Sequence, residues 1–241
     1  MAGIIKEALQ WIVESQQPKI IRDGDWSYTS EKLQRLDEEL RADPIGMSTL
    51  SGLVDYIKSK VDALDDKMLI HVVSPTEVRL ISPLDADRER EYLVKVRAEL
   101  PEITYGRFLK TEPFLISIRA NFVQNEGSEA VLRFAGTIES GTLAAYSDDG
   151  ISQSATVKKG IAGKESALVP NPVKLRPYRT FIEVQQPESE FIFRMRDCNE
   201  EIGCAIFEAD GGAWKREAMK NIKEYLEFEL ADLAPQFTVI S

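Results

Sequence analysis

The sequence predicts an α+β protein, in which N-terminal helices and a small antiparallel meander precede an antiparallel sheet closed by an amphipathic helix. Two changes of pattern carry this prediction. Apolar residues recur with a helical period up to about residue 64 and again after residue 213, whereas they alternate with polar residues over 68–98 and in most of 142–209. We expect a boundary near residue 125, with parts 1–125 and 126–241 that could also form one continuous domain.

Helices are expected at three places before residue 65. The first covers residues 3–16, where the apolar side chains share one face. A short second helix is capped within Thr29-Ser30-Glu31 and ends at Asp43-Pro44. The third begins at Ser48 or Thr49, and its apolar stripe consists of Leu50, Leu53, Val54, Ile57, Val61 and Leu64.

The middle of the chain changes from helix to strand and back. Alternating segments at 68–73, 78–81 and 92–98 predict the meander. Two helices follow it. Thr111 is expected to cap the first, with Pro113 in its first turn, and the second runs from Asn125-Glu126-Gly127 to about Ile138.

The remainder is predicted to be mainly strand. Asp148-Asp149-Gly150 indicates a hairpin between strands near 142–147 and 152–159, because glycine tolerates the positive φ of such turns. Residues 160–172 are rich in small residues and proline and predict a mobile loop. Strands are expected near 173–184, 190–197 and 203–209, and Gly211-Gly212 leads into the closing helix, whose apolar residues are Trp214, Ala218, Ile222, Tyr225, Leu226 and Leu230.

Composition limits the partners and the compartment. The formal net charge of −10 at pH 7 opposes attraction to a phosphate backbone, so nucleic acid is a disfavoured partner unless the fold builds a local basic face. No apolar stretch approaches the roughly 20 residues of a membrane span, and charged residues interrupt the N-terminal apolar pattern. We therefore expect a soluble, cytoplasmic protein with no membrane partner. Cys198 and Cys204 have the spacing of a hairpin and are expected to be reduced.

Arginines beside aromatic residues are the candidate binding residues. Arg176, Tyr178 and Arg179 lie in one segment, and Arg194 and Arg196 are two residues apart, on one face if the segment is a strand. Guanidinium groups beside aromatic rings could bind a small anionic ligand or a nucleic acid. The alternatives are a solvated strand face, with Glu183, Glu188 or Glu190 as partners, and a subunit interface.

Enzymatic chemistry has little support in the sequence, and we expect no catalytic residue, cofactor or metal ion. His71 is the only histidine, which excludes sites built from two imidazoles. No phosphate-binding loop or nucleophile elbow is present. One enzymatic alternative is a metal-dependent nuclease that uses Glu208 and Asp210. The competing interpretation is that these acids shape a turn and the start of a helix.

Four segments also carry a resemblance to a known family: STLSGLVDYIKSK (48–60), MLIHVVSPTEVRLISP (68–83), ITYGRFLKTEPFLISI (103–118), and the stretch from DDGISQSATVKKGI to LRPYRTFIEV (148–184). In this order they resemble the YfdQ-like prophage family, a domain of temperate phages and prophage islands. The resemblance covers nearly the whole chain and implies a phage or prophage origin. It brings no active site to carry over to residues of this chain.

The resulting expectation is a phage-encoded, non-enzymatic binding protein. Several strands with exposed edges predict a homo-oligomer. The phage resemblance implies action on a host factor or a host-made ligand, in counter-defence. Two other functions stay open besides the nuclease. One is an accessory nucleic-acid-binding factor in phage recombination or replication, and the other is a shell or virion component that uses the hairpin at 142–159 as an interlocking arm.

Overall fold

The computed structural model describes residues 41–64, 67–85, 88–139, 142–148, 153–159, 163–169, 171–198 and 202–241, together with Lys6, Trp11, 20–23 and 26–29. The chain divides into two compact units, Met1–Arg41 and Ala42–Ser241. In the first unit, β1 (Ile20–Asp23) pairs antiparallel with β2 (Trp26–Thr29). The helix expected at 3–16, of which only Lys6 and Trp11 are described, and the short helix expected after Thr29 lie outside the described residues.

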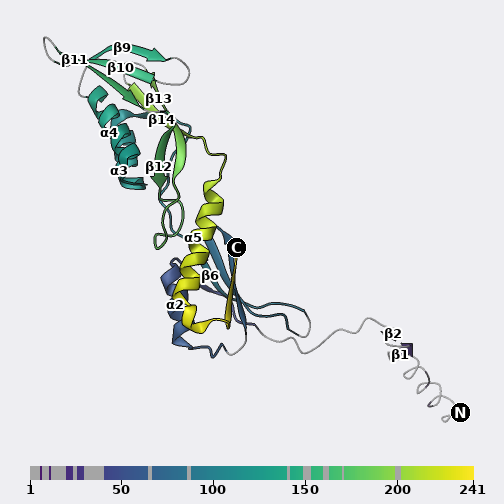
Figure 1. Ribbon diagram of the computed structural model, residues 1–241. Helices are drawn as coiled ribbons and strands as arrows, with labels where there is room; N and C mark the ends of the chain where they lie inside the picture. The colour runs from purple at the N-terminus through teal and green to yellow at the C-terminus, as the bar shows by residue number, and fades with distance from the viewer. Residues whose placement is uncertain are drawn as a thin grey trace. The chain divides into compact units, whose positions relative to one another are not determined.

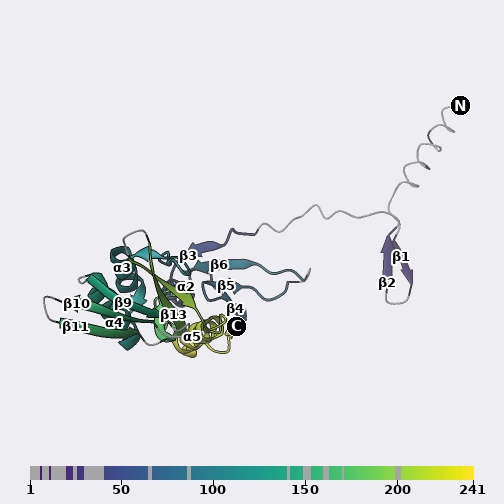
Figure 2. The ribbon, with the colours of Figure 1, turned by 90° about the horizontal axis from the view of Figure 1, so that it is seen from above.

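The second unit begins with a mixed five-stranded sheet, here called the first sheet, of order β15-β4-β5-β6-β3. Strands β4 (Met68–Ser74), β5 (Glu77–Ile81) and β6 (Tyr92–Arg97) are antiparallel, which confirms the meander. The short strands β3 (Ile45–Met47) and β15 (Phe237–Ile240) run parallel to β6 and β4 at the two edges. Figure 2 shows β3, β6, β5 and β4 side by side in this order.

Two helices cover one face of the first sheet. Helix α2 (Leu50–Ser59) begins at Thr49, whose side chain accepts a hydrogen bond from the Gly52 N–H at 3.1 Å. Helix α5 (Trp214–Glu229) contacts β4, β15 and α2 (Figure 1). Its residues Ile222 and Leu226 are buried in the same core as the alternate residues of the meander and Leu53 and Ile57 of α2.

A second five-stranded sheet is antiparallel and has the order β7-β14-β13-β12-β8. Its strands are β7 (Leu109–Lys110), β8 (Phe122–Val123), β12 (Val173–Pro177), β13 (Ser189–Asp197) and β14 (Ile202–Glu208). Helices α3 (Thr111–Asn121) and α4 (Glu126–Glu139) pack against it. Phe191 and Phe193 of β13 are fully buried and contact aromatic rings of α3, α4 and β8.

The third sheet has three antiparallel strands of order β11-β10-β9. Strands β9 (Thr142–Asp148) and β10 (Gln153–Lys159) pair as the expected hairpin, whose turn at 149–152 lies outside the described residues. The expected loop over 160–172 is wrong for Gly163–Val169, which form strand β11 and pair with β10. A segment of small and polar residues can form a strand when a neighbouring strand is available to pair with it. Its composition alone does not reveal that such a neighbour exists.

Two further expectations need correction. The strand expected at 173–184 ends at Pro177, because residues 178–186 leave the sheet and fold as turns. Thr111 does not cap α3, since its hydroxyl donates to the carbonyl of Ile202 at 2.9 Å, and Lys110 occupies the cap position. The closing helix α5 lies on the first sheet, although it follows the last strand of the second in sequence.

Residues 178–186 connect the two large sheets. Phe181 and Val184 are buried in the core of the first sheet, and the Thr180 hydroxyl donates to the carbonyl of Pro75 at 2.6 Å. Gln186 fixes the backbone of this segment: its Oε1 accepts from the N–H groups of Arg179 and Thr180, and its Nε2 donates to the carbonyl of Phe181. Both cores combine residues from before and after position 125, where we expected a boundary.

Candidate functional site

Arg179 is the centre of the most interconnected polar cluster in the described residues. It follows β12, and only 6% of its surface is exposed. Its Nη1 donates to Oε1 of Glu208 at 3.0 Å, and its Nη2 donates to the Ser189 hydroxyl. The guanidinium carbon lies 4.1 Å from the centre of the Trp214 ring, which is within cation–π range. A residue expected on an open strand face is therefore a buried cation.

Asp210 completes this cluster and lies four residues before Trp214, the first residue of helix α5. Its Oδ2 accepts from the Ser189 hydroxyl at 2.5 Å and from the Trp214 N–H at 3.4 Å, and its Oδ1 accepts from the Gly212 N–H at 3.0 Å. Burial alone would raise the pKa of Asp210, but these hydrogen bonds and the charge of Arg179 outweigh burial and hold it below its ordinary value.

The buried groups around Arg179 have shifted pKa values. Burial lowers the pKa of Arg179, although the neighbouring Tyr105, Asp210 and Glu208 oppose that shift. Burial also raises the pKa of Tyr105, whose ring stacks on Phe191 at 5.7 Å. Within the described residues, the Tyr105 hydroxyl and the Arg179 Nε have no hydrogen-bond partner.

The cluster does not have the geometry of an activated nucleophile. Ser189 is buried, and its hydroxyl lies between the guanidinium of Arg179 and the carboxylate of Asp210. A carboxylate whose pKa is lowered is a weak general base. The same contacts argue against a metal-dependent nuclease site, because Glu208 is ion-paired with Arg179 and Asp210 accepts a hydrogen bond from the Gly212 N–H in a turn. No group of three metal-ligating side chains occurs among the described residues.

A cavity of about 250 Å³ opens beside this cluster. It is lined by Lys174, Glu188, Ser189, Glu190, Asp210, Ala213, Trp214 and Glu217. Glu188 is neutralised by Lys174 at 3.7 Å and Arg176 at 3.3 Å. Within the described residues, the carboxylates of Glu190 and Glu217 have no ion pair. The cavity therefore combines excess negative charge with an indole ring, which is the chemistry that recognises an organic cation.

The five predicted binding residues do not form one site. Arg176 and Arg179 lie near the cavity, but each is paired with a glutamate. Tyr178 is placed by its backbone N–H, which donates to the carbonyl of Asn121 at 2.9 Å. Arg194 and Arg196 lie towards the opposite end of β13, where Arg194 donates to the carbonyl of Phe193 and Arg196 covers the Phe108 ring at 4.1 Å.

Sequence reasoning missed Ser189, Glu190, Trp214 and Glu217 as lining residues. Trp214 was expected on the apolar face of the closing helix, Glu190 only as a partner of arginine, and Glu217 was not singled out. Trp214 and Glu217, three residues apart at the start of a helix, are a local signal of a shared face. Nothing local shows that the start of β13 lies against them.

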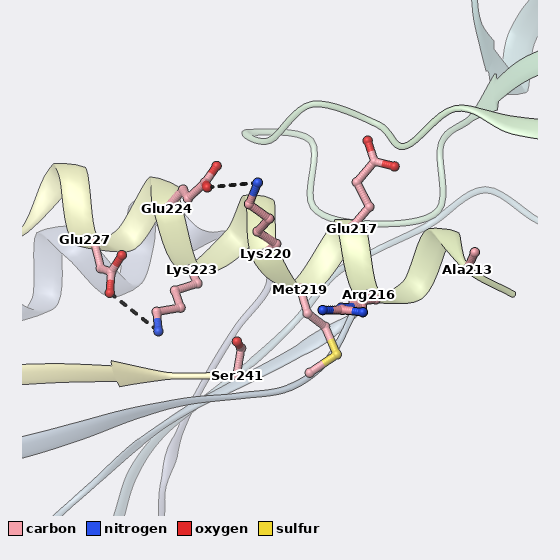
Figure 3. A pocket seen from close by; sticks show the side chains of 9 residues that line it. All are labelled: Ala213, Arg216, Glu217, Met219, Lys220, Lys223, Glu224, Glu227 and Ser241. Atoms are coloured by element: carbon pink, nitrogen blue, oxygen red, sulfur yellow. Dashed lines mark ion pairs between the residues drawn. The ribbon is translucent and has the colours of Figure 1, made fainter.

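A larger, open groove of about 920 Å³ runs along α5 (Figure 3). Four of its charged groups form two ion pairs, Lys220 with Glu224 at 3.4 Å and Lys223 with Glu227 at 3.7 Å, and Glu217 lines this groove as well as the smaller cavity. These pairs are four residues apart on an exposed helix face and leave little charge for a ligand. The smaller cavity beside Trp214 is therefore the better candidate.

The two cysteines and the single histidine do not belong to this cavity. Cys204 is buried within β14, opposite Met195, and Cys198 is half-buried and directly follows β13. His71 lies on β4 opposite Arg79.

Comparisons with family models, curated proteins and solved structures found no match to this chain. No described helix is both long and apolar enough to cross a membrane.

Proposed function

We propose that this chain is a non-enzymatic binding protein whose ligand site is the cavity beside Trp214. The observation that carries the proposal is the lining of that cavity: Glu190 and Glu217 have no ion pair among the described residues and lie beside an indole ring, whereas Arg176 and Arg179 are neutralised. Carboxylates and an aromatic wall suit an ammonium or guanidinium group. The ligand is then a basic side chain of a protein partner and not a small anion.

The identity of that partner follows from the sequence resemblance. If the chain derives from a phage or prophage, the partner is a host factor and the binding serves counter-defence in the host cytoplasm. The self-association expected from exposed strand edges is part of the same proposal. A homo-oligomer would present several copies of the cavity to one target, which raises the overall binding strength.

Binding at the cavity can be tested with a fluorescently labelled peptide rich in lysine and arginine. We expect the double variant Glu190→Gln/Glu217→Gln to bind this peptide about three- to tenfold more weakly, since partly exposed charge pairs contribute about 0.2–1 kcal/mol each. The matched control is Glu224→Gln/Glu227→Gln, which removes the same charge at two positions of α5 outside the cavity. Equal losses in both double variants, or no loss in the first, would contradict the cavity as the site.

Counter-defence can be tested in a bacterial host that carries a phage-defence system. Expression of the protein should raise the number of plaques formed by a sensitive phage, and the Glu190→Gln/Glu217→Gln variant should raise it less. Plaque numbers that do not respond to the protein would contradict this part of the proposal while leaving peptide binding untouched.

A further inference from the structure

The first sheet has few acidic residues in its strands. Its five strands contain one of the chain's 40 acidic residues, Glu77, together with Arg79, Lys95, Arg97 and the only histidine, His71. A protein with a net charge of −10 therefore has a sheet whose strands carry more basic than acidic residues. This is the local basic face that a nucleic-acid partner would require.

The basic residues lie on the face of the first sheet that the helices do not cover. The alternate residues Val72, Val78, Val94 and Val96 are buried against α2 and α5. The other described helices, α3 and α4, pack on the second and third sheets. Arg79 and Lys95 expose about a third of their side chains and Arg97 exposes 65%. We call His71, Arg79, Tyr92, Lys95 and Arg97 the basic face.

The residues of the basic face form an ordered row. His71, Arg79 and Lys95 are directly opposite one another on three neighbouring strands, so that the row spans about 10 Å at the usual strand spacing. Glu77 and Arg97 form the next pair, and Glu77 contacts Arg79, Lys95 and Arg97. Three cations share one carboxylate, so positive charge remains. Burial would raise the pKa of Glu77, but the hydrogen bonds from Arg79 and Arg97 and the nearby positive charges outweigh burial and lower it.

An aromatic ring lies next to this row. A register shift between Leu80 and Ile81 places Tyr92 opposite Ile81, and the Arg79 guanidinium carbon lies 5.7 Å from the centre of the Tyr92 ring. Tyr92 is 46% exposed. An exposed ring beside a row of cations on an open sheet can stack on an unpaired base while the cations contact the phosphates on either side.

We propose that the basic face of the first sheet binds single-stranded nucleic acid. The phosphates contact Arg79, Lys95 and Arg97, and Tyr92 and His71 offer ring faces to the bases. Unpaired bases can reach exposed rings on an open sheet directly, whereas the bases of a duplex are paired and stacked inside the helix. This site is distinct from the cavity beside Trp214 and does not depend on the function proposed for that cavity.

The first measurement is fluorescence anisotropy with a labelled single-stranded oligonucleotide of about 20 nucleotides, long enough to exceed a single-domain binding site. Neutralising about three phosphates predicts a slope near −2 in log affinity against log salt, or about 20-fold weaker binding when salt rises from about 50 to 200 mM. A duplex of the same sequence should bind more weakly. No anisotropy change at the lower salt concentration, or tighter binding of the duplex, would overturn the proposal.

Variants then locate the contact. Lys95→Gln/Arg97→Gln should weaken oligonucleotide binding about tenfold and flatten the salt slope by more than one, and Tyr92→Leu should weaken binding about tenfold with the slope unchanged. The matched control is Lys220→Gln/Lys223→Gln on α5, which removes the same charge elsewhere and should bind like the unaltered protein. Thermal melting of each variant checks that the fold is retained.

Two outcomes would contradict the basic face as a nucleic-acid site. One is a control that loses as much affinity as Lys95→Gln/Arg97→Gln, because binding would then follow overall charge. The other is binding to heparin or to vesicles of anionic lipid without binding to the oligonucleotide, because the face would then recognise another polyanion.

Discussion

Arg179 and Arg176 are three residues apart and have opposite environments. Arg179 is 6% exposed and bonded to Glu208 and Ser189, whereas Arg176 is about one-third exposed and pairs with Glu188, which is equally exposed. A buried cation with several hydrogen bonds contributes far more to stability than an exposed ion pair does. Arg179 therefore supports the fold and is a poor probe of ligand binding.

We predict that Arg179→Ala lowers the free energy of unfolding by at least about 2 kcal/mol, because Ser189 and Asp210 lose their cationic partner and Trp214 loses its contact. Arg176→Ala, the matched control, should lower it by about 0–1 kcal/mol. Urea unfolding followed by tryptophan fluorescence measures both values. Equal effects of the two substitutions would mean that the buried network around Arg179 does not stabilise the protein.

Asp210 makes stability depend on pH in a definite direction. Its pKa in the folded protein lies below the ordinary value of 3.8, so the carboxylate stabilises the fold above that value and the stabilisation is lost as pH falls through the folded pKa. Asp210→Asn keeps a side-chain oxygen for the Gly212 N–H but has no charge to titrate. We predict that the variant is less stable at neutral pH and that the difference shrinks below about pH 4. Parallel stability curves for the two proteins would exclude this linkage.

At the scale of elements, helix α4 depends on one glycine where it meets β12. Asn125 and Ser128 bond to each other's backbone N–H groups and fix the start of the helix. A Cβ on Gly127 would overlap the backbone carbonyl oxygen of Lys174, whereas a Cβ on Gly136, in the same helix, would meet nothing within 4 Å. The close approach of α4 to β12 therefore requires glycine at position 127.

Alanine at these two positions should have opposite effects. Gly127→Ala should destabilise the protein by about 1–3 kcal/mol, because the backbone of β12 must move. Gly136→Ala should stabilise it by up to about 1 kcal/mol, since alanine is the better helix former. Denaturant unfolding of both variants checks the prediction. A neutral Gly127→Ala would show that α4 can shift without cost.

At the scale of the whole molecule, strand edges give a reason for self-association. Strands β15 and β3 end the first sheet, and β9 and β11 end the third, within the residues that the structure describes. Ile240 on β15 and Ile45 on β3 are each more than 40% exposed. Unpaired edges with apolar side chains are the features that pairing with a second copy would cover.

We therefore predict a mass that is a multiple of 27.2 kDa in mass photometry. Contacts made by strand pairing and apolar side chains are insensitive to ionic strength, so the mass should be the same in low and high salt. A sharp monomer mass across micromolar concentrations would exclude self-association. An assembly that dissociates in salt would instead indicate contacts between charged surfaces.

Much of the fold could be read from local patterns. The α+β class, helix α2, the meander β4–β6, the β9–β10 hairpin and the start of α5 after Gly211-Gly212 all follow from the spacing of apolar residues and from turn residues. Strands β1, β2, β3, β7, β8, β11 and β15 were missed. β3 and β15 have three and four residues, too few for a period, and β11 has the composition of a loop.

Only part of the candidate sites could be predicted from the sequence. The sequence placed arginines beside aromatic rings and acids at the start of α5, but it gave no indication that Arg179 is buried between Glu208, Ser189 and Trp214. It also placed the candidate cations on 176–196, whereas the uncovered basic residues that lie beside an exposed aromatic ring are on β4–β6.

The sequence by itself determined the spacing of apolar residues in most helices and strands and the position of many of their ends, because these features depend on residues a few positions apart. The tertiary structure decided which sheet each helix covers and which charges are neutralised. Glu183 shows the difference: its Oε1 accepts a hydrogen bond from the Ser51 N–H in the first turn of α2, a helix with no acidic residue of its own there. Such contacts join residues more than a hundred positions apart, and they form only when the burial of apolar surface brings the two segments together.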